Sequence, residues 1–221
     1  MATIHRTTME PGKLDLLASW LPEQPWYRPT GKPPRLSRAG GFRLDDPAGE
    51  VGIEFVFVTD GTDGVEATYS VPLTYRGAPL PGAEPGLVGT AEHGVLGRRW
   101  VHDAAYDAVA IAQLLEFIGG RVEAQHQNRS DTLDPSVSRH GVLVGGSAST
   151  DARAVSSAAH GTTIAVELTD PVSADVSAAD LHVVRVLGDG GSVDGTVRAH
   201  VEADWTRPGG TVARRPVAVV R

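Results

Sequence analysis

Residues 51–59 read VGIEFVFVT, and this stretch decides the fold class more than any other part of the chain. Its β-branched and aromatic side chains form a nearly continuous apolar run, which is typical of a well-buried strand. Turn residues follow (DGTDG, 60–64), and residues 68–75 (TYSVPLTY) then predict a second strand. Because Pro72 has no N–H to donate, we expect this second strand to lie at a sheet edge or to carry a bulge.

One helix is predicted before this pair of strands and one after it. The first begins near Pro11, has leucines at helical spacing and ends at Pro22. The second covers residues 104–118, where the apolar side chains share one face, and Asp103 is expected to cap it. A glycine pair follows at 119–120 and predicts the C-terminal stop.

The sequence changes character beyond residue 140. Five short β-type runs, separated by turn residues, predict a small antiparallel sheet or barrel: GVLVGGSAS (141–149), TTIAVELT (162–169), LHVVRVLG (181–188), TVRAHVEADW (196–205) and RRPVAVVR (214–221). Residues 173–180 predict at most a turn or two of helix. The expected organisation is therefore an α+β domain over 1–125, a linker over 126–140 and a β-rich domain over 141–221.

Composition and charge exclude several classes of protein. The 221 residues carry 27 acidic and 20 basic side chains, a net charge of −7, which argues against a nucleic-acid partner. The absence of cysteine excludes disulfides, thiolate nucleophiles and cysteine-bound zinc. Lysine occurs only at Lys13 and Lys32, so most of the chain has none for Schiff-base or phosphate chemistry. Neither a secretory signal nor a membrane span is apparent, and we expect a cytoplasmic protein with no membrane partner.

Two pairs of residues could take part in metal or acid–base chemistry. Glu92-His93 and His102-Asp103 flank a short strand predicted at 98–101, and they could meet across a turn. The favoured interpretation is that Asp103 caps a helix and that the histidines cover polar surface. The glycines at 145–146 match neither a nucleophile elbow, a phosphate loop nor a dinucleotide fingerprint. The sequence thus predicts no catalytic residue, no metal site and no cofactor.

Aromatic side chains are better candidates for a ligand site. Indole and phenol rings can stack on a sugar ring as well as fill a core. Trp20 shares a helix face with leucines, which favours the core, whereas Trp26 and Tyr27 follow a proline in a loop. The predicted ligand-binding residues are Trp26, Tyr27, Arg28, His93, Trp100 and His102.

Residues 16–27 (LLASWLPEQPWY) resemble the opening of the N-terminal cap domain of actinobacterial maltokinases, a helix ending in W-L-P-x-Q-x-W-[YF]. Residues 101–107 (VHDAAYD) are similar to the place where that cap leads toward the kinase body. The resemblance covers about residues 5–125 and extends to short, stand-alone proteins, often labelled as branching-related, that share the cap. It implies a cystatin-like fold, with a helix packed across a curved antiparallel sheet.

The chain departs from the kinases of that family. In them the cap is non-catalytic and sits on a two-lobed body, whereas here no strand lysine for the phosphates follows the cap and there is no room for a C-lobe. We therefore expect a binding or accessory protein of α-glucan, maltose or trehalose metabolism, not a kinase. Its partner would be a carbohydrate or an enzyme of sugar metabolism, and a homodimer through residues 68–75 is a further expectation. The alternatives are a small carbohydrate-active enzyme for α-glucan glycosyl transfer, or a small-molecule sensor.

Overall fold

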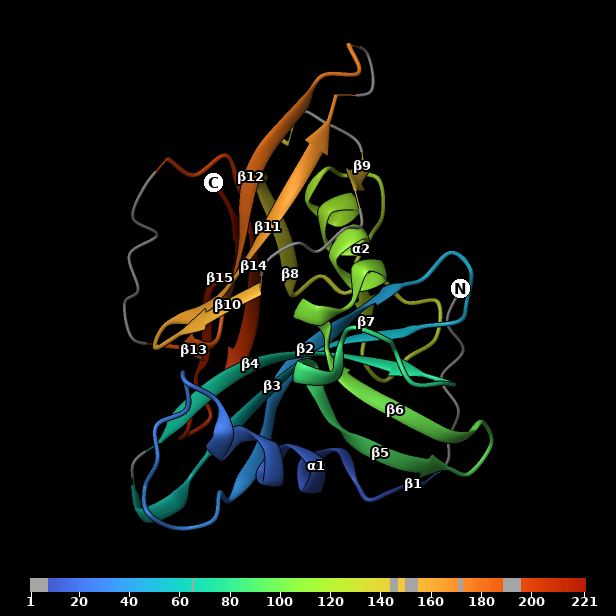
Figure 1. The fold of residues 1–221 in the computed structure, drawn as a ribbon. Helices are drawn as coiled ribbons and strands as arrows, with labels where there is room; N and C mark the ends of the chain where they lie inside the picture. Colours follow the sequence, from blue (N-terminus) through green and yellow to red (C-terminus); the bar gives the residue numbers. More distant parts are fainter. Residues whose placement is uncertain (1–7, 65, 144–146, 150–154, 171–172, 189–195) are drawn as a thin grey trace.

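The computed structural model describes residues 8–64, 66–143, 147–149, 155–170, 173–188 and 196–221. The fold is dominated by β-structure: the described strands form one antiparallel sheet of fifteen strands, against which two α-helices pack (Figure 1). The expectation of an antiparallel sheet with helices is thereby confirmed, although helix is the minor component. No helix in the described part of the chain is long and apolar enough to cross a bilayer.

The N-terminal half supplies both α-helices and the first seven strands. The helices are α1 (Lys13–Trp20), followed by the short 3-10 helix η1 (Leu21–Glu23), and α2 (Ala108–Ile118), preceded by η4 (Ala104–Tyr106). The strands are β1 (Met9–Glu10), β2 (Leu36–Asp45), β3 (Gly52–Asp60), β4 (Ala67–Arg76), β5 (Leu87–His93), β6 (Gly97–Asp103) and β7 (Gln125–His126). Two further 3-10 turns are η2 (Thr62–Gly64) and η3 (Glu84–Gly86).

The described residues of the C-terminal half form strands and no helix, as predicted. They are β8 (Val137–Gly141), β9 (Ser147–Ser149), β10 (Val155–Ala158), β11 (Gly161–Thr169), β12 (Val176–Val184), β13 (Val186–Leu187), β14 (Ala199–Thr206) and β15 (Val212–Val220). The helical turn expected over 173–180 is wrong beyond Asp175, because β12 begins at Val176 and pairs with β11 along its length. Strand β8 occupies the end of the segment predicted as a linker and pairs with β14.

Strand pairing connects the two halves at two places. Gly40 of β2 pairs with Trp205 of β14, and Tyr69 of β4 pairs with Val186 of β13. Since β13 directly continues β12, the pairing runs from β4 through β3, β2, β14, β15 and β12 and returns to β4. The cap-like strands and the C-terminal strands are therefore parts of one hydrogen-bonded structure (Figure 1).

Strand β3 is the centre of the fold because both of its faces are buried. Phe55 and Phe57 point into a core shared with α2 and the C-terminal strands, and Phe42 stacks on Phe55 at 4.3 Å between ring centroids. Val56 and Val58 point into a second core, which contains α1 and the opposite faces of β4, β5 and β6. The continuous apolar run of this strand therefore reflects burial on both sides.

Strand β4 is not the edge strand that Pro72 predicted. It pairs with β3 from Ala67 to Tyr75, and its other side pairs first with β13 and then, from Leu73 onward, with β6. Pro72 lies between the part of β4 that pairs with β13 and the part that pairs with β6. Its missing N–H therefore interrupts neither of these two sets of hydrogen bonds. The reason for expecting a dimer through this strand is removed, because both sides of β4 have partners.

The second helix begins later than predicted. Asp103 caps η4 by accepting from the Ala105 amide at 3.1 Å, and Asp107 is the residue that caps α2, accepting from the Val109 amide at 3.0 Å. Gly120 follows the C-terminus with a φ of +77°, as the predicted glycine stop requires. Two aspartates four residues apart thus divide the predicted helix into a 3-10 turn and an α-helix.

A buried ion pair also joins the halves. Arg185, between β12 and β13, is fully buried, and its Nη2 donates to both carboxylate oxygens of Asp103 at 2.8 and 2.6 Å. Its Nε donates to Thr162, and its guanidinium lies 5.2 Å from the centroid of the Trp26 ring. The backbone carbonyl of the same arginine accepts from the Ser70 amide of β4.

Candidate functional site

The aromatic residues predicted to bind a ligand lie in the core beside α1. Trp26 is only 1% exposed and contacts the rings of Trp20 and Tyr69, each at 5.8 Å between centroids. Tyr27 is also buried and donates from its hydroxyl to Asp60 at 2.7 Å. Neither ring offers a face to solvent, so they hold α1 and the following loop on the sheet.

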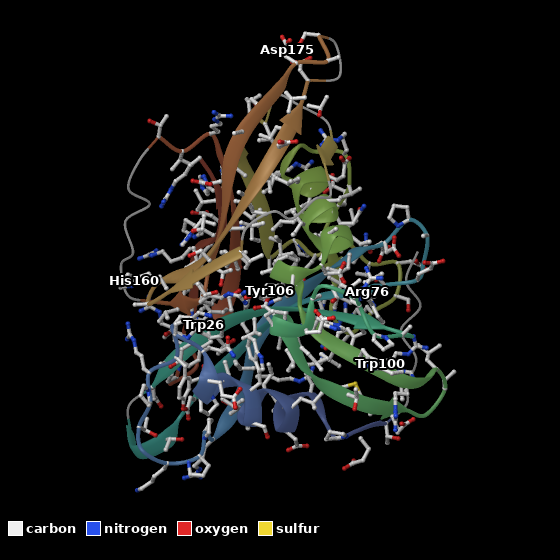
Figure 2. The ribbon with its side chains drawn as sticks, in the orientation of Figure 1. Trp26, Arg76, Trp100, Tyr106, His160 and Asp175 are labelled. Carbon is white, nitrogen blue, oxygen red and sulfur yellow. The ribbon has the colours of Figure 1, made fainter. Side chains whose placement is uncertain are left out.

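The other four predicted ligand residues are not brought together with these rings. Arg28 is exposed, and its backbone amide donates to the hydroxyl of Tyr69. Trp100 is half-buried on β6, well separated from Trp26 (Figure 2). His102 is 2% exposed, and burial lowers its pKa. Only His93, at the end of β5, lines the cleft described below.

The two His–carboxylate pairs do not form a metal site. Glu92 pairs with Arg98 on the surface, and Asp103 pairs with the buried Arg185. No group of three metal-ligating side chains occurs among the residues that the structure describes.

A polar cleft of about 880 Å³ lies on the α1 side of the sheet, next to the N-terminus of that helix. We call it the Glu54 cleft. Its walls come from α1, from β2, β3 and β4, from the β5–β6 hairpin and from the loop after β7. Its polar lining side chains are Lys13, Arg38, Arg43, Asp46, Glu50, Glu54, Tyr75, His93, Arg99, Gln127 and Asn128. This volume is typical of small-ligand sites.

Glu54 is the buried acceptor at the centre of the cleft. Its Oε2 forms an ion pair with Lys13 and accepts from the Tyr75 hydroxyl at 3.0 Å, and its Oε1 accepts from Gln127 at 3.1 Å. Burial and the neighbouring Glu54 raise the pKa of Tyr75 well above its usual value, so its hydroxyl stays a neutral donor. The three partners come from α1, β4 and the loop after β7, and this carboxylate fixes their positions.

Gly41 makes room for Gln127. A Cβ at this position would lie 2.1 Å from the carbonyl oxygen of Phe55 and 2.3 Å from the Gln127 side-chain nitrogen. Its φ of +135° is a further reason for glycine. The glutamine amide therefore reaches across β2 to Glu54 and to the Phe55 carbonyl.

A β-bulge brings two arginines of β2 to the same face. Arg38 and Arg43 are five residues apart, a spacing that would place them on opposite faces of a regular strand. The register shifts between Arg38 and Gly40, so that Arg43 pairs with Glu54 and Arg38 pairs with Val58. Both partners point to the α1 side, and both arginines line the cleft.

The sequence analysis did not predict this cleft, although two features of the sequence point to it. Glu54 interrupts the most apolar strand of the chain, and a buried acid in such a strand requires partners. Lys13 is one of only two lysines. Neither signal identifies Tyr75 or Gln127 as the partners, because strand pairing and the loop after β7 bring these residues to the acid.

The fold and cleft together define a β-dominated protein with a polar cleft on its N-terminal half. Residues 20–107 match the family model of the maltokinase N-terminal cap domain, so the chain contains a segment similar to that domain, as the sequence resemblance predicted. The match is 88 residues long, less than half of the chain. No curated protein matches the chain. Arg38, Arg43, Glu54, Tyr75 and Arg99 lie within the matched segment, whereas Lys13 and Gln127 lie on either side of it.

Proposed function

We propose that this protein is a non-catalytic binding protein of α-glucan, maltose or trehalose metabolism and that it binds a saccharide in the Glu54 cleft. The match of residues 20–107 to the maltokinase cap supports the metabolic setting. Helix α1 packed across β4 and β5 agrees with the cystatin-like arrangement that the resemblance implies. The observation that carries the proposal is the cleft itself, whose donors and acceptors are fixed in place around Glu54.

The lining chemistry favours a polyhydroxy ligand over an apolar one. Asn128 is exposed at the cleft, and its side chain has no hydrogen-bond partner within the described residues. Amide and guanidinium groups are suited to bind sugar hydroxyls, and the ring of Tyr75 gives the cleft an apolar wall.

Binding fits the cleft better than glycosyl transfer does. That reaction needs two carboxylates with free oxygens on either side of the scissile bond. Glu54 already accepts from Lys13, Tyr75 and Gln127. Asp46 accepts from backbone amides of the loop before β3, at 2.9 to 3.0 Å. Two of the three carboxylates that line the cleft are thus committed to structure, and Glu50 alone does not supply the pair that the reaction needs.

Calorimetric titration with maltose, maltoheptaose, trehalose, glucosamine and glycogen tests the proposal. We expect saturable binding of at least one saccharide, weakened several-fold in Asn128→Ala. The matched control is Arg98→Gln on the exposed side of β6, which should bind as the unchanged protein does. If neither these saccharides nor an anionic sugar such as glucose 6-phosphate or glucuronate binds, the carbohydrate proposal is overturned. Incubation with maltoheptaose, followed by product analysis, checks the glycosyl-transfer alternative.

A partner enzyme of sugar metabolism and a homodimer remain predictions. Sedimentation of the protein alone addresses the second, and co-purification with a maltose- or trehalose-converting enzyme addresses the first.

A further inference from the structure

The Glu54 cleft differs in charge from the chain that contains it. The chain carries a net charge of −7, yet the cleft is lined by four cationic side chains and three carboxylates. Two of those carboxylates, Glu54 and Asp46, are occupied by internal donors, and Glu50 is exposed at the rim. Of the four cations, only Lys13 has a carboxylate partner among the described residues. The cleft therefore presents three guanidinium groups that form no ion pair with a described carboxylate, and its four cations outnumber its three carboxylates.

The three arginines come from two strands that flank the centre of the cleft. Arg38 and Arg43 stand on β2, and Arg99 stands on β6, where its Nη2 donates to the carbonyl of Leu96. Arg99 lies beside the end of β4, since a Cβ on Gly77 would be 3.2 Å from its Nη1. Tyr75, also on β4, lies between the β2 and β6 arginines in the order of the sheet.

Buried donors within this set lack an acceptor. In the described part of the chain, buried arginine nitrogens without a hydrogen-bond partner occur in Arg43, Arg99 and Arg185, and the first two line the cleft. Leaving such a donor unpaired is unfavourable, and a folded protein normally satisfies it. By contrast, Arg76 and Arg139 each form two bonds to one carboxylate.

We propose that the Glu54 cleft recognises an anionic sugar, with Arg38, Arg43 and Arg99 binding its phosphate or carboxylate group. This inference rests on the proposed function and specifies the ligand class of the same site. The planar guanidinium fork matches both groups, and ion pairing in a partly buried cleft is stronger than at an open surface. The side-chain oxygen of Gln127, the side chain of Asn128 and the ring of Tyr75 remain for the sugar.

The test is calorimetric titration of the full chain with glucose, glucose 6-phosphate, glucuronate and inorganic phosphate at low ionic strength. Glucose 6-phosphate or glucuronate should bind at least tenfold more tightly than glucose, and the stronger of the two identifies the anionic group. Arg43→Gln and Arg99→Gln should each weaken this binding about tenfold, as loss of one charge-assisted hydrogen bond predicts. Arg98→Gln, one residue away on the opposite face of β6, should leave it unchanged. Circular dichroism and thermal melting establish that each variant is folded.

The other outcomes separate the two proposals. Equal affinity for glucose and its charged derivatives, unaffected by the arginine variants, would overturn the anionic ligand and leave saccharide binding standing. Inorganic phosphate binding as tightly as glucose 6-phosphate would also overturn it, because the sugar would then contribute nothing. Absence of binding by every sugar, neutral or charged, would overturn both. Weakening of glucose 6-phosphate binding as salt is raised would support the ion pairing.

Discussion

The guanidinium of Arg185 lies 2.6 Å from the carboxylate of Asp103, although 82 residues separate the two in sequence. Both side chains are buried, and each belongs to a different half of the chain. A buried pair of this kind contributes little net stability by itself, but loss of one partner leaves the other charge uncompensated. It therefore makes correct assembly of the two halves a condition for a stable fold.

Arg185→Met should lower the free energy of unfolding by about 3–5 kcal/mol, because Asp103 would then be buried without its counter-ion. Asp103→Asn combined with Arg185→Met should recover part of the loss, since the charge is removed and Asn still caps η4. Urea unfolding measures both. The control is Glu92→Gln in the surface pair with Arg98, where both side chains are 61% exposed and at most about 1 kcal/mol is expected. A loss as small as that of the control would show that the stability of the fold does not depend on this pair.

Tyr27→Phe should destabilise the fold without changing ligand affinity. The variant removes the donor to Asp60, whose other bonds come from Thr62 and from the Arg35 amide. A buried acceptor that loses one partner costs about 1–3 kcal/mol. Thermal unfolding and saccharide titration of the same preparation distinguish the two properties. Weaker binding at unchanged stability would instead return Tyr27 to the ligand site.

Acid should destabilise the protein in part through Asp107. Burial alone would raise the pKa of this carboxyl, but two bonds of 2.7 Å from Arg76, together with the Val109 amide, outweigh burial and lower it. A carboxyl with a lowered pKa stabilises the fold above its unfolded pKa of about 3.9, and this contribution disappears as pH falls through the folded value.

The variant Arg76→Gln tests that assignment. Without the guanidinium, burial dominates and raises the pKa of Asp107 above its unfolded value, so the variant should be less stable at pH 7. Protonation of Asp107 then favours the folded state, and the loss of stability on acidification should be smaller than in the unchanged protein. Melting temperatures between pH 2.5 and 7 follow the shift, with Arg98→Gln as the control for lost positive charge. If melting temperature depends on pH in the same way in Arg76→Gln and Arg98→Gln, Asp107 does not contribute to acid destabilisation.

Gly41→Ala should disturb the cleft more than the rest of the fold. The added methyl group meets the Phe55 carbonyl and the Gln127 amide, so Gln127 must leave Glu54. We expect a destabilisation of about 1–3 kcal/mol together with weaker ligand binding. Gly61→Ala is the control, because nothing lies within 4 Å of a Cβ placed there. Normal binding by Gly41→Ala would mean that Gln127 is not needed at the site.

Much of the fold could be predicted from local sequence patterns. The apolar run of β3, the C-terminal β-runs and the second helix each have a periodicity or a cap that needs no distant partner. Strand β2 was not predicted, because its glycine pair and charged residues (LSRAGGFRLD) break the alternation. The position of Pro72 was misread because one side of a strand can have two successive partners, and no local pattern shows where the second takes over.

The ligand site was harder to predict, because its members come from distant positions. Lys13, Glu54 and Gln127 meet only through the sheet, and Arg38 joins Arg43 on one face only through a bulge. Trp26 and Tyr27 attracted attention as aromatic residues in a loop, but a loop that packs back on a helix is part of the core. Exposure of a loop side chain depends on tertiary packing, which a single sequence does not reveal.

The return of the strand pairing to β4 has a consequence for how the chain acquires its structure. Because Gly40 pairs with Trp205 and Tyr69 pairs with Val186, this closed path of paired strands cannot form until nearly the whole polypeptide has been made. Contacts between such distant positions slow folding, and during synthesis the phenylalanines of β2 and β3 emerge long before the strands that cover them. The newly made N-terminal half therefore passes through a period in which an aromatic sheet face is open to solvent, and such a face favours self-association.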